Sequence, residues 1–279
     1  MKPLFTLFFF CTMTFSQSVF NQEPQVRVLL ANTADTLDID LRGQWSLRNT
    51  GRASMQLTEN SRVRFINGGG QLSMYDARGS LLAKTPSFML GSNSDTTGLF
   101  LDTPPAGNEL QGSRGARRYY QGQLHLYLGS DQEMNIVLQL PLEDYIKEVL
   151  PDDLPPELPL AALQAQAIMI RSQAVFALSK PVQEGVFYHL RFEVDAPTPS
   201  VHIQATELID QAVDETTGLI LTINGALLDP QDTRSTVLIR DLYSARRGEL
   251  HELFSKNTSL EEILSHYYPQ AKVTTIYAP

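Results

Sequence analysis

The first hundred residues alternate apolar and polar positions in short runs, a pattern typical of β-strands. Val26, Val28 and Leu30 alternate with Arg27 and Leu29, and similar short runs continue to about residue 101, separated by Asn, Thr, Gly and Asp. Three glycines at 68–70 mark a turn between two of these runs. Because the region shows this alternation without helical periodicity, we predict several short strands in succession.

A second set of strands is predicted from residue 117 to residue 137, with a turn at residues 129–131. Between the two sets, residues 104–115 are rich in Pro, Gly, Asn and Ser, which predicts a loop. We therefore divide the chain into a β-rich N-terminal part at residues 17–103 and a core domain at residues 116–279.

Helical patterns begin after residue 140. Pro141 suits the first helical position and Pro151 ends the helix. Glu143 and Lys147 stand four residues apart on the polar side, which predicts an ion pair along the helix surface. The opposite, apolar face carries Leu142, Tyr145, Ile146 and Val149.

A second helix is predicted to open at Pro159. Its buried stripe is rich in alanine, which lets another backbone approach closely, and Gln164 and Arg171 lie seven residues apart on a second face. A third helix is predicted over residues 207–215, followed by a hairpin that turns at Asn224 and Gly225. A last helix begins with the capping-box spacing of residues 259 and 262. These elements predict an α+β fold with several short helices.

The first 16 residues have the features of a secretory signal peptide. Lys2 supplies the positive end, residues 4–15 are mostly apolar, and Ser16 is a small residue suited to cleavage before Gln17. The apolar run is shorter than the roughly 20 residues that span a bilayer, so we expect no stable membrane span and an extracytoplasmic protein. The alternative is a lipoprotein modified at Cys11, the only cysteine of the chain.

Charge and motifs narrow the function classes. The net charge of −9 and the absence of a long basic run argue against a nucleic-acid partner. The five histidines never stand at a metal-ligand spacing, and no phosphate-binding or dinucleotide-binding loop occurs. A chain cleaved after residue 16 would have no thiol for catalysis or zinc binding. We therefore predict neither a metal nor another cofactor.

Three ordered segments carry a resemblance to a known family. Residues 118–124, 140–155 and 158–175 read RYYQGQL, LPLEDYIKEVLPDDLP and LPLAALQAQAIMIRSQAV. They resemble the patterns YRGxL, NxLPLExYLxGVVPxEMP and WPxEALKAQAVAARTYA of the stage II sporulation protein D family (SpoIID/LytB, the amidase-enhancer domain). Residues 28–30, 212–218 and 261–269 extend the resemblance over most of the mature chain.

The resemblance implies peptidoglycan chemistry in the cell envelope. Members of the family include lytic transglycosylases that cut glycan strands stripped of stem peptides, and proteins that enhance cell-wall amidases. Cleavage needs one carboxyl group that protonates the glycosidic oxygen and then activates a hydroxyl of the sugar. In the family this acid is the Glu of VPxEMP, and the alignment places Asp153 there, with Asp152 and Glu157 nearby.

Two departures from the family pattern make catalysis doubtful. The Asp153 carboxyl sits about 1 Å short of a glutamate carboxyl, and a displacement of about 1 Å can cost on the order of a hundredfold in rate. Only about thirty residues separate Leu228 from Ser259, where the family has two further cleft-lining stretches. We therefore expect a protein that binds glycan strands or enhances a cell-wall amidase. The alternative is a reduced but active lytic transglycosylase with Asp153 as general acid/base.

Three further side chains are candidates for binding the glycan. The resemblance places Gln164 and Arg171 at polar positions of the family's helix, where they could hydrogen-bond sugar hydroxyls or carboxylates, and Tyr145 could stack on a sugar ring. Other interpretations stay open: Arg171 could orient the acidic loop through a salt bridge, and Tyr145 could belong to the core. The carboxylates of residues 152–157 could simply favour the start of the helix that follows.

Overall fold

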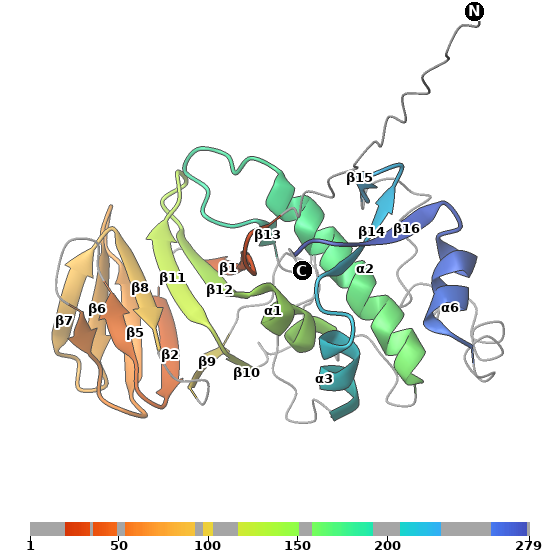
Figure 1. Ribbon diagram of the computed structural model, residues 1–279. Coiled ribbons are helices and arrows are strands. Elements are labelled where there is room, and N and C mark those ends of the chain that lie inside the picture. The colour runs from red at the N-terminus through yellow and green to blue at the C-terminus, as the bar shows by residue number, and fades with distance from the viewer. Residues whose placement is uncertain are drawn as a thin grey trace, which may run out of the picture.

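The computed structural model describes residues 20–33, 36–48, 54–92, 97–102, 117–150, 158–191, 207–229 and 258–277. The predicted signal peptide and the loop that carries Asp152, Asp153 and Glu157 lie outside these residues. Strands fill the first half of the described chain and helices dominate the second, which confirms the predicted α+β class (Figure 1). The β-rich part lies at one end of the molecule and the helices gather at the other.

Two large sheets form the β-rich end. The first has the strand order β10 (Arg117–Tyr120), β9 (Gly98–Asp102), β2 (Thr36–Arg42), β5 (Arg62–Asn67), β6 (Leu72–Asp76) and β7 (Leu81–Thr85). The second has the order β13 (Leu190–Arg191), β1 (Gln25–Thr33), β12 (Met134–Pro141), β11 (Gln123–Leu128), β8 (Ser87–Gly91), β3 (Ser46–Arg48) and β4 (Met55–Gln56).

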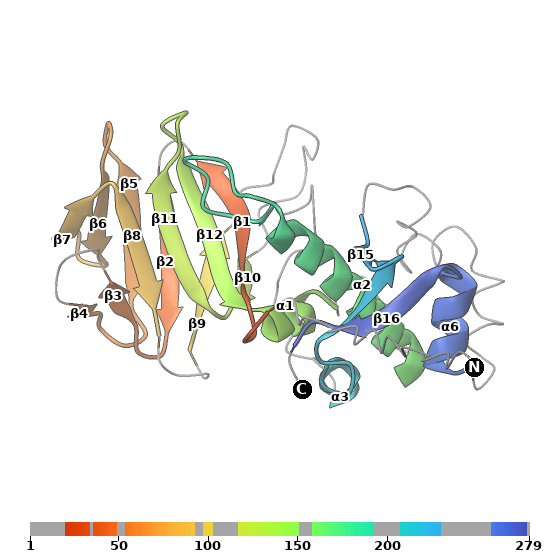
Figure 2. The same ribbon diagram turned by 45° about the horizontal axis from the view of Figure 1, so that its top comes forward.

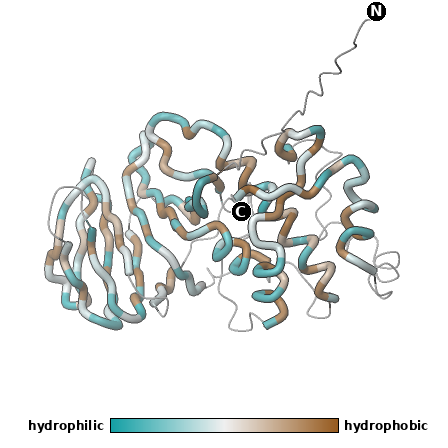
Figure 3. Tube along the Cα trace, in the orientation of Figure 1, coloured by the Kyte–Doolittle hydropathy of each residue, from teal (hydrophilic) through white to brown (hydrophobic). Residues whose placement is uncertain are grey.

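The two sheets pack through the apolar positions of the alternating pattern. In β2, Leu37, Ile39 and Leu41 are buried, while the residues between them are only partly covered. Successive side chains of a strand point to opposite faces, so this pattern sends one apolar set into the core and one polar set outward. Figure 3 shows the same alternation of hydrophobic and hydrophilic positions along the strands. The rings of Phe65 and Phe88 meet edge to face between the sheets, with centroids 5.2 Å apart.

Strand pairing joins regions that are far apart in the sequence. β1 pairs antiparallel with β12, from Gln25 opposite Pro141 to Thr33 opposite Met134. β10 pairs with β9, and β11 pairs with β8. Both sheets therefore draw strands from each side of the loop predicted at residues 104–115.

The helical end is built around one long helix, α2 (Leu160–Ser179). Around it lie α1 (Leu142–Val149), α3 (Glu207–Asp214), α6 (Leu260–Tyr267) and a sheet of order β15 (Ala226–Leu227), β14 (Leu219–Ile223) and β16 (Ala271–Thr275) (Figure 2). Most of α2 from Ala162 to Val175 is buried, which agrees with its alanine-rich sequence. Ser172 on α2 accepts a hydrogen bond from the Leu221 backbone N–H at 2.8 Å, which fixes β14 against the helix.

Local signals in the sequence predicted the ends of these elements correctly. Ser259 Oγ accepts from the Glu262 backbone N–H, and Glu262 Oε2 accepts from the Ser259 backbone N–H, so the capping box before α6 is confirmed. Asn224 and Gly225 both have positive φ, at 52° and 79°, as a two-residue hairpin turn requires. The helix predicted at residues 207–215 is α3.

Candidate functional site

The first helix of the candidate site is capped by a distant part of the chain. α1 follows β12 without a loop, and its N-cap residue Pro141 makes no side-chain capping hydrogen bond. The backbone N–H of Leu142 instead donates to the Pro24 carbonyl at 3.0 Å, and that of Glu143 donates to Glu23 Oε1 at 2.7 Å. Residues just before β1 thus satisfy two donors that the helix leaves open.

Glu143 is the centre of a polar network inside the helical end. Its carboxylate accepts hydrogen bonds from Arg171 Nε at 3.0 Å and Nη2 at 2.6 Å. It also accepts from the Gly218 backbone N–H and from the Tyr277 hydroxyl, both at 3.1 Å. Arg171 is fully buried and donates through Nη1 to the Leu219 carbonyl at 3.1 Å. The network joins α1, α2, the start of β14 and the C-terminal segment.

Gly218 is required for this arrangement. Its φ is +70°, and a Cβ atom at this position would stand 2.5 Å from the Tyr277 ring. Any larger residue would displace the ring whose hydroxyl reaches Glu143. Burial and the neighbouring Glu143 carboxylate raise the pKa of Tyr277, so this hydroxyl keeps its proton and donates.

The ion pair predicted between Glu143 and Lys147 is wrong. Lys147 Nζ lies 2.8 Å from Asp214 Oδ1 on α3, and Glu143 binds Arg171. A fully buried guanidinium needs a charged partner much more than an exposed ammonium does, because burial removes water from the charge. The buried cation therefore takes the carboxylate, and Lys147 pairs across to the next helix.

Gln164 and Arg171 lie on one side of α2, since both contact the segment from α3 to β14. Gln164 Nε2 donates to Glu215 Oε2 at 2.6 Å, and Glu215 Oε1 accepts from Gln211 at 2.8 Å. The salt-bridge partner of Arg171 is Glu143 on α1, outside the acidic loop. Tyr145 is 1% exposed and packs in the core cluster. A contact of these three side chains with glycan stays a prediction.

The network also ties together the two helices on either side of the acidic segment. The loop at residues 151–157 joins the end of α1 to the start of α2, and its flanking residues Leu150 and Leu158 are both buried. Glu143 and Arg171 tie the two helices together, so the residues that flank this segment, Leu150 and Leu158, are fixed in the core. Asp153, the candidate general acid, belongs to this loop and lies outside the described residues.

The sequence interpretation missed Glu148, a buried acid in the last turn of α1. Its side chain is 7% exposed, and Oε2 has no hydrogen-bond partner among the described residues. Burial raises the pKa of Glu148 to about 8, against a smaller lowering by a hydrogen bond from the Gln121 backbone. A signal was present, because the family pattern LPLExYLxGVVP has glycine where this chain has Glu148.

No metal site and no membrane helix were found in the part of the chain that the structure describes. No group of three or more His, Cys, Asp or Glu side chains there could hold a metal ion. His189 accepts from the Arg27 backbone N–H at 3.1 Å, and burial lowers its pKa to about 4. Among the described helices, none is both long and apolar enough to cross a bilayer.

Part of the chain matches the model of a known protein family. Residues 130–223 match the family model of SpoIID, the stage II sporulation protein. The chain carries a SpoIID domain. The match runs from before β12 to the end of β14, so Glu143, Arg171 and Gly218 all lie within it. The domain indicates a function related to the cell wall.

The relatives add little beyond this assignment. An uncharacterized protein of Brachyspira hyodysenteriae (strain ATCC 49526 / WA1) is 32% identical over 113 residues. The match covers 39% of this chain and 29% of that protein. The chain therefore spans less than a third of the length of this relative. No solved structure matches the chain.

We expect Glu143→Ala to destabilise the protein by about 3–5 kcal/mol, because it leaves the Arg171 charge buried without a partner. Urea unfolding followed by circular dichroism measures the loss. The control is Asp214→Ala, which removes the Lys147 ion pair at a carboxylate that is 64% exposed and should cost about 1 kcal/mol or less. Equal losses in the two variants would contradict the central role of the Glu143 network.

We expect Glu148→Gln to stabilise the protein more at pH 8 than at pH 5. The folded carboxyl keeps its proton up to about pH 8, whereas the ordinary pKa of the group is 4.5. The folded state therefore binds more protons between these values, and the contribution of Glu148 to stability falls as pH rises through this window. Glutamine has nearly the same shape as glutamate but does not ionise, so the substitution removes this loss of stability at higher pH.

Melting temperatures of both proteins from pH 4 to pH 9 test the Glu148 prediction. The exposed Glu261→Gln on α6 is the matched control and should leave the curve unchanged. If the melting temperatures of Glu148→Gln and the unaltered protein differ by the same amount at every pH, Glu148 does not hold its proton in the folded state.

Proposed function

We propose that this is an extracytoplasmic protein that binds the glycan strands of peptidoglycan through its SpoIID domain and cleaves them little or not at all. The observation that carries the proposal is the SpoIID match over residues 130–223. The extracytoplasmic location rests on the signal-peptide pattern of residues 1–16, with lipidation at Cys11 as the alternative.

The arrangement of the helices supports a binding surface around the acidic loop. Residues 151–157 contribute three carboxylates that can accept hydrogen bonds from sugar hydroxyls. Gln164 stands one turn into α2 after this loop and is partly exposed, while its amide is oriented by Glu215. Arg171 and Tyr145 support this surface from the interior, because both are buried.

The chemistry of the available acids favours binding over cleavage. A general acid must reach the glycosidic oxygen, and the Asp153 side chain is one methylene shorter than the glutamate of the family pattern. Glu148 holds a proton near neutral pH but is buried at the end of α1. A protein that holds glycan strands without cutting them suits the second role seen in the family, in which a cell-wall amidase is the partner.

Co-sedimentation with purified peptidoglycan sacculi tests the binding. We expect the unaltered protein to sediment with sacculi and Gln164→Ala to bind roughly two- to tenfold more weakly, the effect of one hydrogen bond of about 0.5–1.5 kcal/mol. Gln173→Ala is the matched control, because Gln173 lies nine residues along α2 on its opposite side. Failure of the unaltered protein to sediment would overturn the proposed function.

Incubation with peptide-stripped glycan strands tests the absence of cleavage. Mass spectrometry should detect no anhydro-muramic products from the unaltered protein. Asp153→Glu restores the carboxyl reach of the family pattern, and products from this variant alone would show that the missing methylene is the reason for inactivity. Products from the unaltered protein that disappear in Asp153→Asn would instead identify a working lytic transglycosylase.

A further inference from the structure

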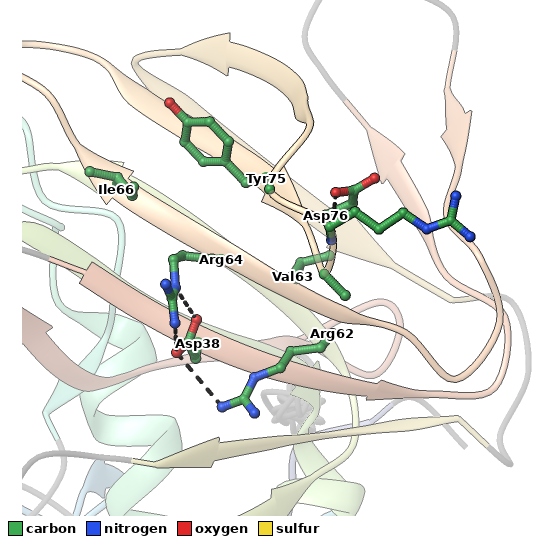
Figure 4. Close-up of a pocket in the computed structure, with 10 residues that line it drawn as sticks. Asp38, Arg62, Val63, Arg64, Ile66, Tyr75 and Asp76 are labelled. Carbon is green, nitrogen blue, oxygen red and sulfur yellow. Dashed lines mark hydrogen bonds and ion pairs between the residues drawn. The ribbon is translucent and has the colours of Figure 1, made fainter.

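A hollow of about 410 Å³ lies on the outer face of the six-stranded sheet (Figure 4), and its lining residues all precede the SpoIID match in the sequence. Its lining comes from residues 38–79, on β2, β5, β6 and the turn that follows β6. The volume falls within the range of roughly 300–1,000 Å³ that small-molecule sites occupy. Nothing in the match at residues 130–223 accounts for this hollow.

Strand register places three of the lining side chains in one row, which Leu81 extends beyond the hollow. Asp38 on β2 pairs with Arg64 on β5, Arg64 pairs with Tyr75 on β6, and Tyr75 pairs with Leu81 on β7. Directly paired residues of antiparallel strands share a face of the sheet. Since the neighbouring residues Val63 and Phe65 are buried, this row points away from the core.

One half of the row is polar and stays well solvated. Arg64 donates to both carboxylate oxygens of Asp38 at 2.7 Å, and Arg62 lies 3.7 Å from Asp38 and 3.5 Å from Asp40. Figure 4 shows both guanidinium groups directed toward Asp38. The arginine side chains are more than half exposed, so their remaining N–H donors are open to a ligand. Hydrogen bonds from Arg64 lower the pKa of Asp38, which keeps it an acceptor.

The other half of the row is apolar. Tyr75 is partly exposed, and Leu81 beside it is 56% exposed, so both present apolar surface to solvent. The turn at the end of β6 closes this side, because Asp76 accepts from the backbone N–H groups of Arg78 and Ser80 at 2.9 and 2.8 Å. An aromatic ring on a fixed strand therefore lies beside a fixed Asp and Arg pair.

The charges of the hollow select among ligand classes. Two aspartates and three arginines line it, and Asp40 lies next to Arg62, so the carboxylates largely offset the guanidinium groups. A polyanion would meet Asp38 and Asp40 at close range and would lose much of its attraction. A sugar fits better, since its hydroxyls both donate and accept hydrogen bonds while its C–H face packs on an aromatic ring.

We propose that this hollow is a second glycan subsite, which binds the β-1,4-linked N-acetylhexosamine backbone with a sugar ring on Tyr75 and its hydroxyls on Arg64 and Asp38. The chemical identity of the sugar rests on the proposed function, but the site belongs to a different part of the chain. The protein then has two sites for one glycan strand, the hollow on the six-stranded sheet and the surface proposed for the SpoIID domain. Two linked weak sites bind one strand more tightly than either site does alone.

Titration of the full-length protein with the β-1,4-linked tetrasaccharide of N-acetylglucosamine, followed by amide NMR shifts, tests the subsite. We expect shifts at residues 38, 62–64 and 75–79. Tyr75→Ala should weaken binding there about tenfold and Tyr75→Phe should bind like the unaltered protein, because the ring and not the hydroxyl makes the contact. Tyr188→Ala, at another partly exposed tyrosine, is the matched control and should bind normally.

The outcomes separate this subsite from the proposed function. If the protein sediments with sacculi but the tetrasaccharide causes no NMR shifts in the hollow, the subsite is overturned and the proposed function stands. Shifts in the hollow together with sedimentation that Gln164→Ala leaves unchanged and Tyr75→Ala weakens would support the subsite and contradict the proposed function of the SpoIID domain. Shifts caused by polyphosphate but not by the tetrasaccharide would identify an anion site and overturn the proposal. Unchanged melting temperatures confirm that each variant is folded.

Discussion

The buried ion pair between Arg171 and Glu143 is the constraint on which the helical end depends. A guanidinium without exposure needs a charged partner and further acceptors, and Glu143 and the Leu219 carbonyl supply them. The same carboxylate then draws in the Gly218 N–H and the Tyr277 hydroxyl. One charge in the middle of α2 thus sets the positions of α1, the start of β14 and the C-terminal segment.

The position of this network explains how a largely β-structured protein presents a helical cell-wall domain. β12 lies in the seven-stranded sheet and continues directly into α1, so the sheet and Glu143 belong to one rigid connection. The segment before β1 caps α1, and Phe20 pairs with Tyr277. α1 is therefore held against the seven-stranded sheet, and α2 is tied to α1 through Arg171 and Glu143. The polar row on β2, β5 and β6 lies at the other end of the molecule from these helices (Figure 1).

Elements with local signals were predictable from the sequence. The capping box of Ser259, the turn at Asn224 and Gly225, and the prolines that open α1 and α2 each act within a few residues, and the structure has helices and turns there. Partners of charged side chains were not predictable in this way. The spacing of four residues predicted an ion pair between Glu143 and Lys147. Glu143 pairs with Arg171 instead, because Arg171 is buried, which no local pattern reveals. The burial of Glu148 likewise follows from tertiary packing, although its place at the glycine position of the family pattern was a signal in the sequence.

The sequence by itself determined the α+β class, most element boundaries and, through the motifs at residues 140–175, the SpoIID family. These properties depend on hydrophobic period, caps and residue order, all of which are local. Only the tertiary structure decided that β1 pairs with β12, that Arg171 and Glu143 meet inside, and that Asp38, Arg64 and Tyr75 form one outer row. Strand register and the burial of charge decided these points, because both depend on contacts between residues that are far apart along the chain.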